Sequence, residues 1–402
     1  FPIDFQNIMA INHPYYQEYL SNDVEAGKIF SRLEPIELNE LFYQKDLGKT
    51  LERIAIAGWK EFYTGKTADM IAQCMQRTEG LITKADLKKY QPVERKPVTF
   101  HYRGYEVHSM PPSSSGGVAI AGILNQIENI HFDSLNYHST QHIHYVAEAE
   151  RRVYADRAEF MGDMDFVPVP IDVLISDKYA KMRWNSVDSL NATSSTDITH
   201  GNIPFGYRES EETTHYSVVD KWGNAVSVTT TINGWFGNGI VVDGAGFLLN
   251  NEMDDFSAKP DVPNAYGLIG NTANAIEPSK RMLSSMSPTI VETDEGTLFL
   301  VIGSPGGSTI ITTTAQIIMN VIDFGMDIED AVETPRFHHQ WLPDMIQIEE
   351  RGFASETIQA LEAMGHGIKL RGPIGEANCI AVNSGYMFGA ADSRRNSSAV
   401  GY

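Results

Sequence analysis

The chain is poor in cysteine and has no long apolar run. Its two cysteines, Cys74 and Cys379, have no motif spacing, which argues against a zinc centre or a disulfide-rich domain. A disulfide between them has no support, and we expect buried free thiols. No uninterrupted apolar stretch is long enough to cross a bilayer, so we expect no membrane span in this chain.

Basic residues are also scarce. The 402 residues include 31 Lys and Arg against 52 Asp and Glu, which gives a net charge of −21. Such a surface disfavours nucleic acid and anionic membranes as partners. Three histidines, His138, His142 and His144, lie near the start of a predicted helix. Two histidines at positions i and i+4 can share a metal ion, but no third ligand for such a pair is evident. We therefore expect neither a metal nor a cofactor.

Sequence periodicity and breakers predict a mixture of helices and strands. Helices are expected at 47–59, 67–78, 118–127, 140–161, 310–324 and 355–364, with Thr67 as a cap of the second and a further capped start at Thr83. Strands are expected at 98–102, 105–108, 215–219, 225–233, 247–250, 289–291 and 299–302, followed by a closing hairpin within 380–402. Residues 163–210 are predicted to be loop-like.

The segment Glu211-Glu212-Thr213-Thr214 reads as an internal cleavage site that would expose Thr213 as a new N-terminal residue. A hydroxyl is a weak nucleophile without a base nearby, and a terminal threonine carries one in its own α-amine. The unperturbed pKa of that amine is about 7.7–8. Thr213 also opens a predicted strand.

Alternation along the second predicted strand places Ser227, Thr229, Thr231 and Asn233 on one face. This row of hydroxyls and one amide is expected beside the strand that begins at Thr213. The alternative is an ordinary strand whose threonines face solvent.

Residues 303–309, Gly-Ser-Pro-Gly-Gly-Ser-Thr, lie between a predicted strand and a predicted helix. Such a turn presents backbone N–H groups, and the lack of lysine disfavours a phosphate loop. An oxyanion hole for acyl transfer, with Gly306 and Gly307 as donors, is the functional interpretation. A plain tight turn is the alternative.

Glu252, Asp255 and Asn233 offer the acceptors that an ammonium group needs, although the two acids would also cap a turn. Ser284 and Ser285 are neutral donors that suit a carboxylate. Together with an acyl-transfer nucleophile, these groups indicate a substrate that carries an amino-acid head.

Six motifs carry a resemblance to a known family. They are Thr-Thr-His-Tyr-Ser-Val-Val-Asp at 213–220, Leu-Leu-Asn-Asn-Glu-Met-Asp-Asp-Phe-Ser at 248–257, Leu-Ser-Ser-Met-Ser-Pro at 283–288, Gly-Ser-Pro-Gly-Gly-Ser at 303–308, Pro-Arg-Phe-His-His-Gln-Trp at 335–341 and Pro-Pro-Ser-Ser-Ser-Gly-Gly at 111–117. On these motifs the chain resembles the γ-glutamyltranspeptidases, members of the N-terminal-nucleophile hydrolase superfamily, over essentially its whole length. The resemblance implies an α+β fold, a four-layer αββα sandwich.

Carried over by residue, the resemblance implies a role for each candidate. Thr213 would be the nucleophile, Thr231 would orient it, and Gly306 and Gly307 would form the oxyanion hole. Asn233, Glu252 (Glu or Gln in the family) and Asp255 would bind the α-amino group of the γ-glutamyl unit, Ser284 and Ser285 its α-carboxylate, and Tyr266 would lie in a lid loop.

The same resemblance implies a precursor cleaved between Glu212 and Thr213. Residues 1–212 would be the C-terminal part of the large-subunit segment and 213–402 the small-subunit segment, together one domain. Family precursors carry a carboxylate-binding arginine upstream, and we expect that segment to precede Phe1. Expected partners are a γ-glutamyl donor such as glutathione and an amino-acid or peptide acceptor, in the periplasm or outside the cell. The rivals are an acylase of the same fold and an unprocessed, non-catalytic homologue.

Overall fold

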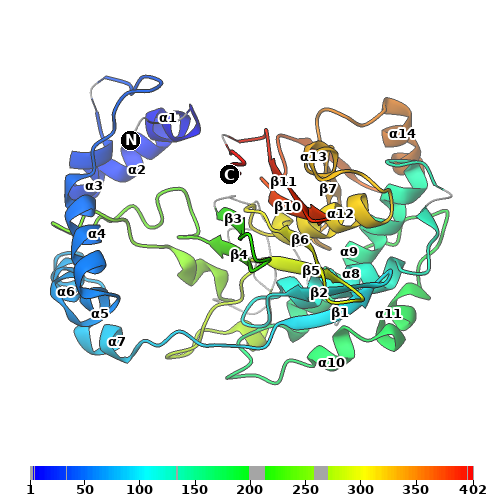
Figure 1. Cartoon of the computed structure of the whole chain (residues 1–402), viewed down its shortest axis with the longest axis horizontal. Helices are drawn as coiled ribbons and strands as arrows, with labels where there is room; N and C mark the ends of the chain where they lie inside the picture. The colour runs from blue at the N-terminus through cyan, green and yellow to red at the C-terminus, as the bar shows by residue number, and fades with distance from the viewer. Residues whose placement is uncertain are drawn as a thin grey trace. The chain divides into compact units, whose positions relative to one another are not determined.

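The computed structural model describes residues 3, 5–32, 34–132, 135–198, 213–257, 270–395 and 397–401 (Figure 1). Tertiary contacts divide the chain into two compact units. Unit 1 comprises Phe1–Arg95 with Ile232–Asn251, and unit 2 comprises Lys96–Thr231 with Glu252–Tyr402. This division by packing does not coincide with the predicted subunit boundary at 212/213, which stays a prediction about covalent organisation.

Unit 1 is built from helices. They are α1 (Phe5–Asn12), α2 (Pro14–Ser21), α3 (Val24–Phe30), α4 (Lys45–Ala57), α5 (Lys60–Thr64), α6 (Lys66–Arg77) and α7 (Lys84–Lys89). The capping box predicted at Thr83 is confirmed. Thr67 as a cap is wrong, because α6 begins after Gly65 and the Thr67 hydroxyl and N–H both donate to the Glu61 carboxylate, at 2.6 and 3.2 Å.

The segment 232–251 belongs to unit 1 because its backbone is held by side chains of these helices. The Thr50 hydroxyl donates to the Ala245 carbonyl at 2.8 Å, and the Tyr19 hydroxyl to that of Gly237 at 3.1 Å. No regular strand forms at 247–250, and Leu248 makes only an isolated bridge with Val241.

Unit 2 contains a six-stranded antiparallel sheet in the order β1-β2-β5-β6-β10-β11. Its strands are β1 (Val98–Tyr102), β2 (Tyr105–Ser109), β5 (Thr289–Thr293), β6 (Leu298–Ile302), β10 (Asn378–Asn383) and β11 (Tyr386–Ala391). A second sheet is the hairpin of β3 (Thr214–Val219) and β4 (Ala225–Thr230), and a third consists of β7 (Phe337–His338), β8 (Ile346–Glu349) and β9 (Ile368–Arg371). The predicted hairpins at 98–108 and within 380–402 are confirmed.

The helices of unit 2 are α8 (Gly116–Ile127), α9 (Thr140–Phe160), α10 (Ile171–Leu174), α11 (Asp177–Trp184), α12 (Thr309–Ile322), α13 (Ile328–Glu333) and α14 (Ser355–Ala363). The prediction of a loop over 163–210 is wrong where α10 and α11 form. Helix α11 is capped by Ser176, whose hydroxyl accepts from the Tyr179 N–H at 3.3 Å.

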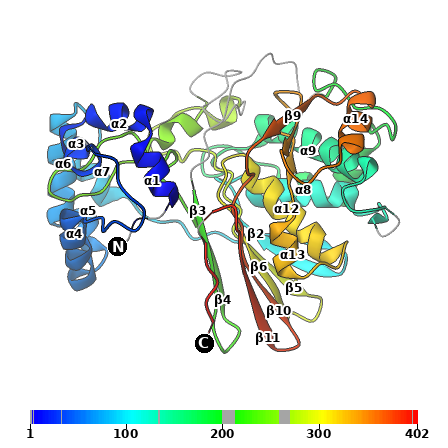
Figure 2. The ribbon, with the colours of Figure 1, turned by 90° about the horizontal axis from the view of Figure 1, so that it is seen from above.

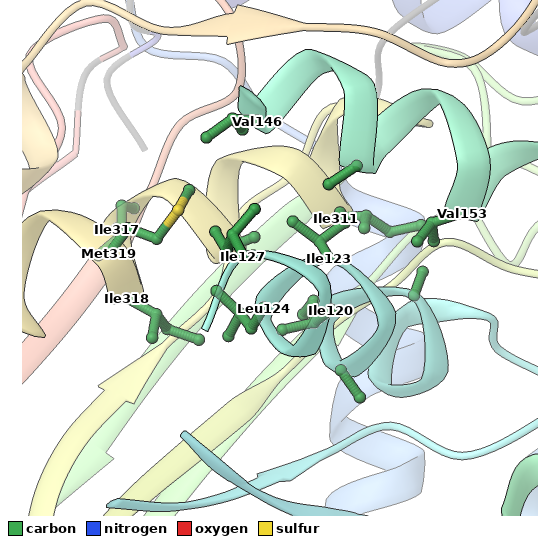
Figure 3. Close-up of a cluster of buried hydrophobic side chains, with 14 of the residues drawn as sticks. Ile120, Ile123, Leu124, Ile127, Val146, Val153, Ile311, Ile317, Ile318 and Met319 are labelled. Atoms are coloured by element: carbon green, nitrogen blue, oxygen red, sulfur yellow. The ribbon is translucent and has the colours of Figure 1, made fainter. Parts of the chain in front are cut away.

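The core of unit 2 lies between the helices and the six-stranded sheet. Helix α8 is buried along its whole length because it packs on β1 and on its neighbours α9 and α12. Figure 3 shows side chains of this cluster from α8 (Ile120, Ile123, Leu124, Ile127), α9 (Val146, Val153) and α12 (Ile311, Ile317, Ile318, Met319).

The β3–β4 hairpin lies on the face of the six-stranded sheet away from α8 and α12 (Figure 2). The Ser217 hydroxyl donates to the Asn378 carbonyl at 2.8 Å, and the Ser227 hydroxyl to that of Ile302 at 3.0 Å. The described residues thus stack a helical layer, a large sheet and a two-stranded sheet. The predicted α+β class is confirmed.

Two expectations from composition have structural counterparts. Cys74 and Cys379 are both buried thiols, as predicted. No helix in the described part of the chain combines the length and the hydropathy that a bilayer-spanning segment requires.

The packing of α8 predicts the effect of truncating its central leucine. Leu124→Ala should lower the free energy of unfolding by about 2–5 kcal/mol, because the lost side chain leaves a cavity against α9 and α12. Urea unfolding followed by circular dichroism measures the change. Leu190→Ala is the matched control, since Leu190 is 71% exposed in the same unit. Equal losses in the two variants would contradict the assigned core.

Candidate active site

The β3–β4 register brings the two candidate threonines to the same end of the hairpin. Its last pair is Thr214 and Thr230, and Thr213 and Thr231 are the adjoining residues at the open end. Facing residues of an antiparallel pair lie on the same side of the sheet. If the alternation continues by one residue, both positions share a side with His215 and Thr229, the pair two residues further in.

That side faces the six-stranded sheet, so the alternative of threonines exposed to solvent is wrong for this row. The His215 ring contacts the Thr229 hydroxyl through Nδ1 at 2.9 Å, and Ser227 bonds to β6. The predicted extension of the strand to Asn233 is also wrong, because β4 ends at Thr230 and Asn233 has φ 71°. Asn233 belongs to unit 1, where its amide donates to the Asn251 carbonyl at 3.3 Å.

His215 fixes the distance between the hairpin and the glycine-rich turn. Its ring is 3% exposed, and burial lowers its pKa to about 4, so the imidazole is neutral. A Cβ on Gly303 would lie 2.3 Å from this ring, which only glycine avoids. The hairpin can approach the end of β6 this closely because residue 303 has no side chain.

The turn after β6 has the conformation that the sequence predicted. Gly306 and Gly307 have φ angles of 134° and 56°, which favour glycine. The Gly306 carbonyl accepts from the Thr309 N–H at 3.0 Å, whereas the N–H groups of Gly306 and Gly307 have no acceptor among the described residues. These two donors lie at the N-terminus of α12, where negative charge is favoured.

The segment 283–288 lies at the same end of the sheet as this turn. It leads into β5 at Thr289, which pairs with Ile302 at the end of β6. The Thr289 N–H also donates to the Ser227 hydroxyl of the hairpin at 3.2 Å. The start of β3, the serine segment and the glycine turn are therefore gathered in one region of unit 2.

Both serines of this segment are arranged as donors. The Ser284 hydroxyl accepts from the Met286 N–H at 3.0 Å, and the Ser285 hydroxyl accepts from Arg157 Nη2 at 3.2 Å. Neither hydroxyl donates to an acceptor within the described ranges. Each serine therefore retains an O–H for an external acceptor such as a carboxylate.

The two candidate acids are tied to the serine segment through Asn274. Its side-chain amide donates to the Asp255 carbonyl at 2.7 Å, and its side-chain oxygen accepts from the Leu283 N–H at 3.0 Å. Burial, followed by the negative charge of Glu252, raises the pKa of Asp255 to about 7. Burial also raises the pKa of Glu252. In both cases burial is the largest cause, and for Asp255 it outweighs the opposing effect of the Arg157 charge.

The sequence interpretation missed Arg157, which lies behind this region on α9. Its guanidinium donates to the Ser115 hydroxyl at 2.8 Å as well as to Ser285, and its charge acts on Asp255. The only available signal was the accumulation of arginine on the helix predicted at 140–161. Periodicity alone does not distinguish Arg157 from the neighbouring Arg152.

The histidines considered for a metal have other roles. His142 packs against the rings of Phe132 and Phe324, at centroid distances of 5.2 and 4.9 Å. His144 contacts His366 at 2.8 Å near Glu148, which is paired with two guanidinium groups, Arg151 and Arg152. Those cations oppose the binding of a further positive ion. Glu212 and Tyr266 lie outside the described residues, so their predicted roles stay predictions.

Comparison with known proteins identifies the family. A sequence profile described as gamma-glutamyltranspeptidase matches residues 1–402. The chain belongs to the γ-glutamyltranspeptidase family. It is 50% identical over 383 residues to a glutathione hydrolase proenzyme of Escherichia coli, covering 94% of this chain and 65% of the relative. A proenzyme of the same name from Pseudomonas sp. strain A14 is 44% identical over 401 residues, covering 96% and 68%.

The chain thus spans about two thirds of the length of these relatives of the γ-glutamyltranspeptidase family. The crystal structure of a cephalosporin acylase from Bacillus halodurans matches 99% of the chain and 71% of its own, with a TM-score of 0.80 at 24% identity. That likeness confirms the predicted fold of the N-terminal-nucleophile hydrolase type.

The raised pKa of Asp255 predicts a pH-dependent stability difference. Folding raises the pKa of this carboxyl group, so the group contributes its full stabilisation when the pH is below its pKa in the unfolded chain. That contribution is lost as the pH rises through the folded-state pKa of about 7. Asp255→Asn, which stays neutral, should therefore gain stability relative to the wild type between pH 4 and pH 8. Urea unfolding midpoints across this range measure the gain. The control is Asp254→Asn on the exposed neighbour, and a gain no larger than the control's would contradict the burial of the Asp255 charge.

Proposed function

We propose that the protein is a γ-glutamyl transferase and hydrolase that works through a covalent ester on Thr213. The observation that supports the proposal is the hairpin register, which pairs Thr214 with Thr230, because its continuation by one residue would make Thr213 and Thr231 a facing pair. The family supports it, since its relatives bear the name glutathione hydrolase proenzyme. The donor would be a γ-glutamyl amide such as glutathione.

The reaction begins with a precursor cleaved between Glu212 and Thr213. The freed α-amine of Thr213 takes the proton of its own hydroxyl, whose oxygen attacks the γ-carbonyl carbon of the donor. The oxyanion of the tetrahedral intermediate accepts from the N–H groups of Gly306 and Gly307, while Thr231 orients the nucleophile. The leaving amine takes the proton as its bond to the carbonyl carbon breaks, leaving the γ-glutamyl ester.

Water or the amine of an amino acid or peptide then attacks this ester. Water releases glutamate, whereas an amine acceptor forms a new γ-glutamyl amide, and each step returns the hydroxyl to Thr213. The reaction uses no cofactor or metal.

The amino-acid head of the donor would be held by two sets of groups. Glu252, Asp255 and Asn233 would accept from its α-ammonium, and the donor-ready Ser284 and Ser285 would bind its α-carboxylate. Tyr266 would belong to a lid over this pocket. The two cleavage products would remain together as large and small subunits, in the periplasm or secreted.

The nucleophile is tested by substitution of Thr213. Thr213→Ala should leave an uncut polypeptide without turnover of a γ-glutamyl anilide, because it lacks the attacking oxygen. Thr213→Ser, which keeps that oxygen, should still be cleaved and retain measurable activity. Intact mass under denaturing conditions, with N-terminal sequencing of each product, detects the cut.

The matched control for this test is Thr230→Ala, which removes an exposed strand threonine from the same hairpin. It should be cleaved and active like the wild type. Self-cleavage and turnover by Thr213→Ala would refute the proposed nucleophile. A wild type with an intact Glu212–Thr213 bond would favour the unprocessed, non-catalytic rival.

The acylase rival is separated by the choice of donor. The two half-buried acids favour a free α-ammonium, so a γ-glutamyl anilide should be cleaved faster than a glutaryl anilide, which lacks that group. Asp255→Asn should reduce this preference by at least about tenfold, as expected for a charge-assisted hydrogen bond. Paired kcat/KM values give the preference, and faster cleavage of the glutaryl substrate would support the rival.

A further inference from the structure

Arg157 is a buried cation whose hydrogen bonds go to serine hydroxyls. It lies on α9 with 5% of its surface exposed, and burial lowers its pKa to about 10, so it is charged at neutral pH. Its Nε donates to Ser115 at 2.8 Å and its Nη2 to Ser285 at 3.2 Å. Ser115 in turn donates to the Ser284 carbonyl at 2.9 Å, so both contacts of the guanidinium lead to the same segment.

No carboxylate of the described chain lies within ion-pair distance of Arg157. The neighbouring buried arginine Arg152 differs, since its Nη1 lies 2.5 Å from the Glu148 carboxylate. A buried charge without an opposite charge is strongly unfavourable in proteins. Asp255 acts on this charge only at a distance, and the described residues supply no anion in contact with the guanidinium, so an external carboxylate would complete the site.

The contact with Arg157 also decides how Ser285 can bond. A guanidinium only donates, so the Ser285 oxygen must accept, and its proton must point elsewhere. Since no acceptor for that proton occurs in the described part of the chain, the hydroxyl is left to donate to a ligand. The positive charge behind the oxygen polarises the O–H bond and strengthens such a donation.

We propose that Arg157 is a positioning residue for the α-carboxylate of the donor, acting through Ser285 and supplying the compensating charge from within α9. This inference rests on the proposed function and adds a specificity determinant to it. The charges of Arg157 and Asp255 also act on each other without direct contact. A ligand that carries both an ammonium and a carboxylate would offer an opposite charge to each of them.

The test compares two donors that differ only in the α-carboxylate, a γ-glutamyl anilide and a 4-aminobutyryl anilide. In the intact protein, Arg157→Gln should lower the ratio of their kcat/KM values by about tenfold, because only the first donor uses the charge-assisted contact. Arg157→Lys keeps the charge without the planar fork and should give an intermediate ratio.

The matched control is Arg152→Gln, on the same helix and equally buried but without contact to either serine. It should lower the melting temperature and leave the ratio unchanged. If Arg157→Gln lowers the kcat/KM values of the two donors by the same factor, their ratio is unchanged. The role of Arg157 is then merely structural and the inference fails. If Arg157→Gln does not fold, Ser115→Ala takes its place, because it removes one of the two contacts of the guanidinium. This variant should lower the ratio by a smaller factor. An unchanged ratio would overturn the inference.

A wild type that cleaves neither donor would refute the proposed function but not this inference. In that case the melting temperature still reports carboxylate binding. L-glutamate should raise it more than 4-aminobutyrate does in the wild type, and Arg157→Gln should abolish the difference. Equal shifts by the two ligands in the wild type would overturn the inference.

Discussion

The antiparallel pairing of β3 and β4 is the constraint on which the candidate site depends. The register decides which side chains point toward the large sheet, and a shift by one residue would turn the whole row outward. Hydrogen bonds from Ser217 and Ser227 to backbone carbonyls of β10 and β6 hold that register against the larger sheet. Because these bonds lie on the face toward the large sheet, they hold strand β3, and with it the adjoining Thr213, against the core of unit 2.

The lack of a side chain at two glycines of the turn is the second constraint on this arrangement. The His215 ring occupies the space where a Cβ of residue 303 would be, and a Cβ on Gly306 would lie 2.4 Å from the Thr309 hydroxyl. The turn is held at its far end by the Tyr154 hydroxyl, which donates to the Ser308 carbonyl at 2.5 Å. A turn fixed in this way keeps its two unused N–H groups in one orientation, which is the preorganisation that oxyanion stabilisation needs.

Much of this organisation follows from the sequence, and the rest does not for definite reasons. Alternation and breakers located the hairpin, the turn and the long helices, since these signals are local. The end of β4 was missed because the backbone leaves the strand after Thr230 through a non-glycine residue, Asn233, with positive φ. Helices α10 and α11 are short, and the prolines before α10 and the polar residues of α11 resemble those of a loop.

Arg157 could not be assigned from the sequence because its role is defined by tertiary partners. The signal for a buried arginine on α9 is the same at positions 151, 152 and 157, and only the contacts separate them. Arg151 and Arg152 share Glu148, whereas Arg157 contacts neutral hydroxyls. A buried charged side chain that has no direct ion-pair partner in the fold is therefore a candidate for a functional role.

The proposed pocket contains two carboxylates on one side and a guanidinium behind two serines on the other. An amino-acid head is neutral overall but dipolar, and its ammonium and carboxylate would compensate both sides at once. A ligand with only one of these charges would leave the other side of the pocket desolvated and uncompensated, which costs more than the missing contact itself. Discrimination in such a site comes chiefly from this penalty on incomplete ligands, and it needs no steric exclusion.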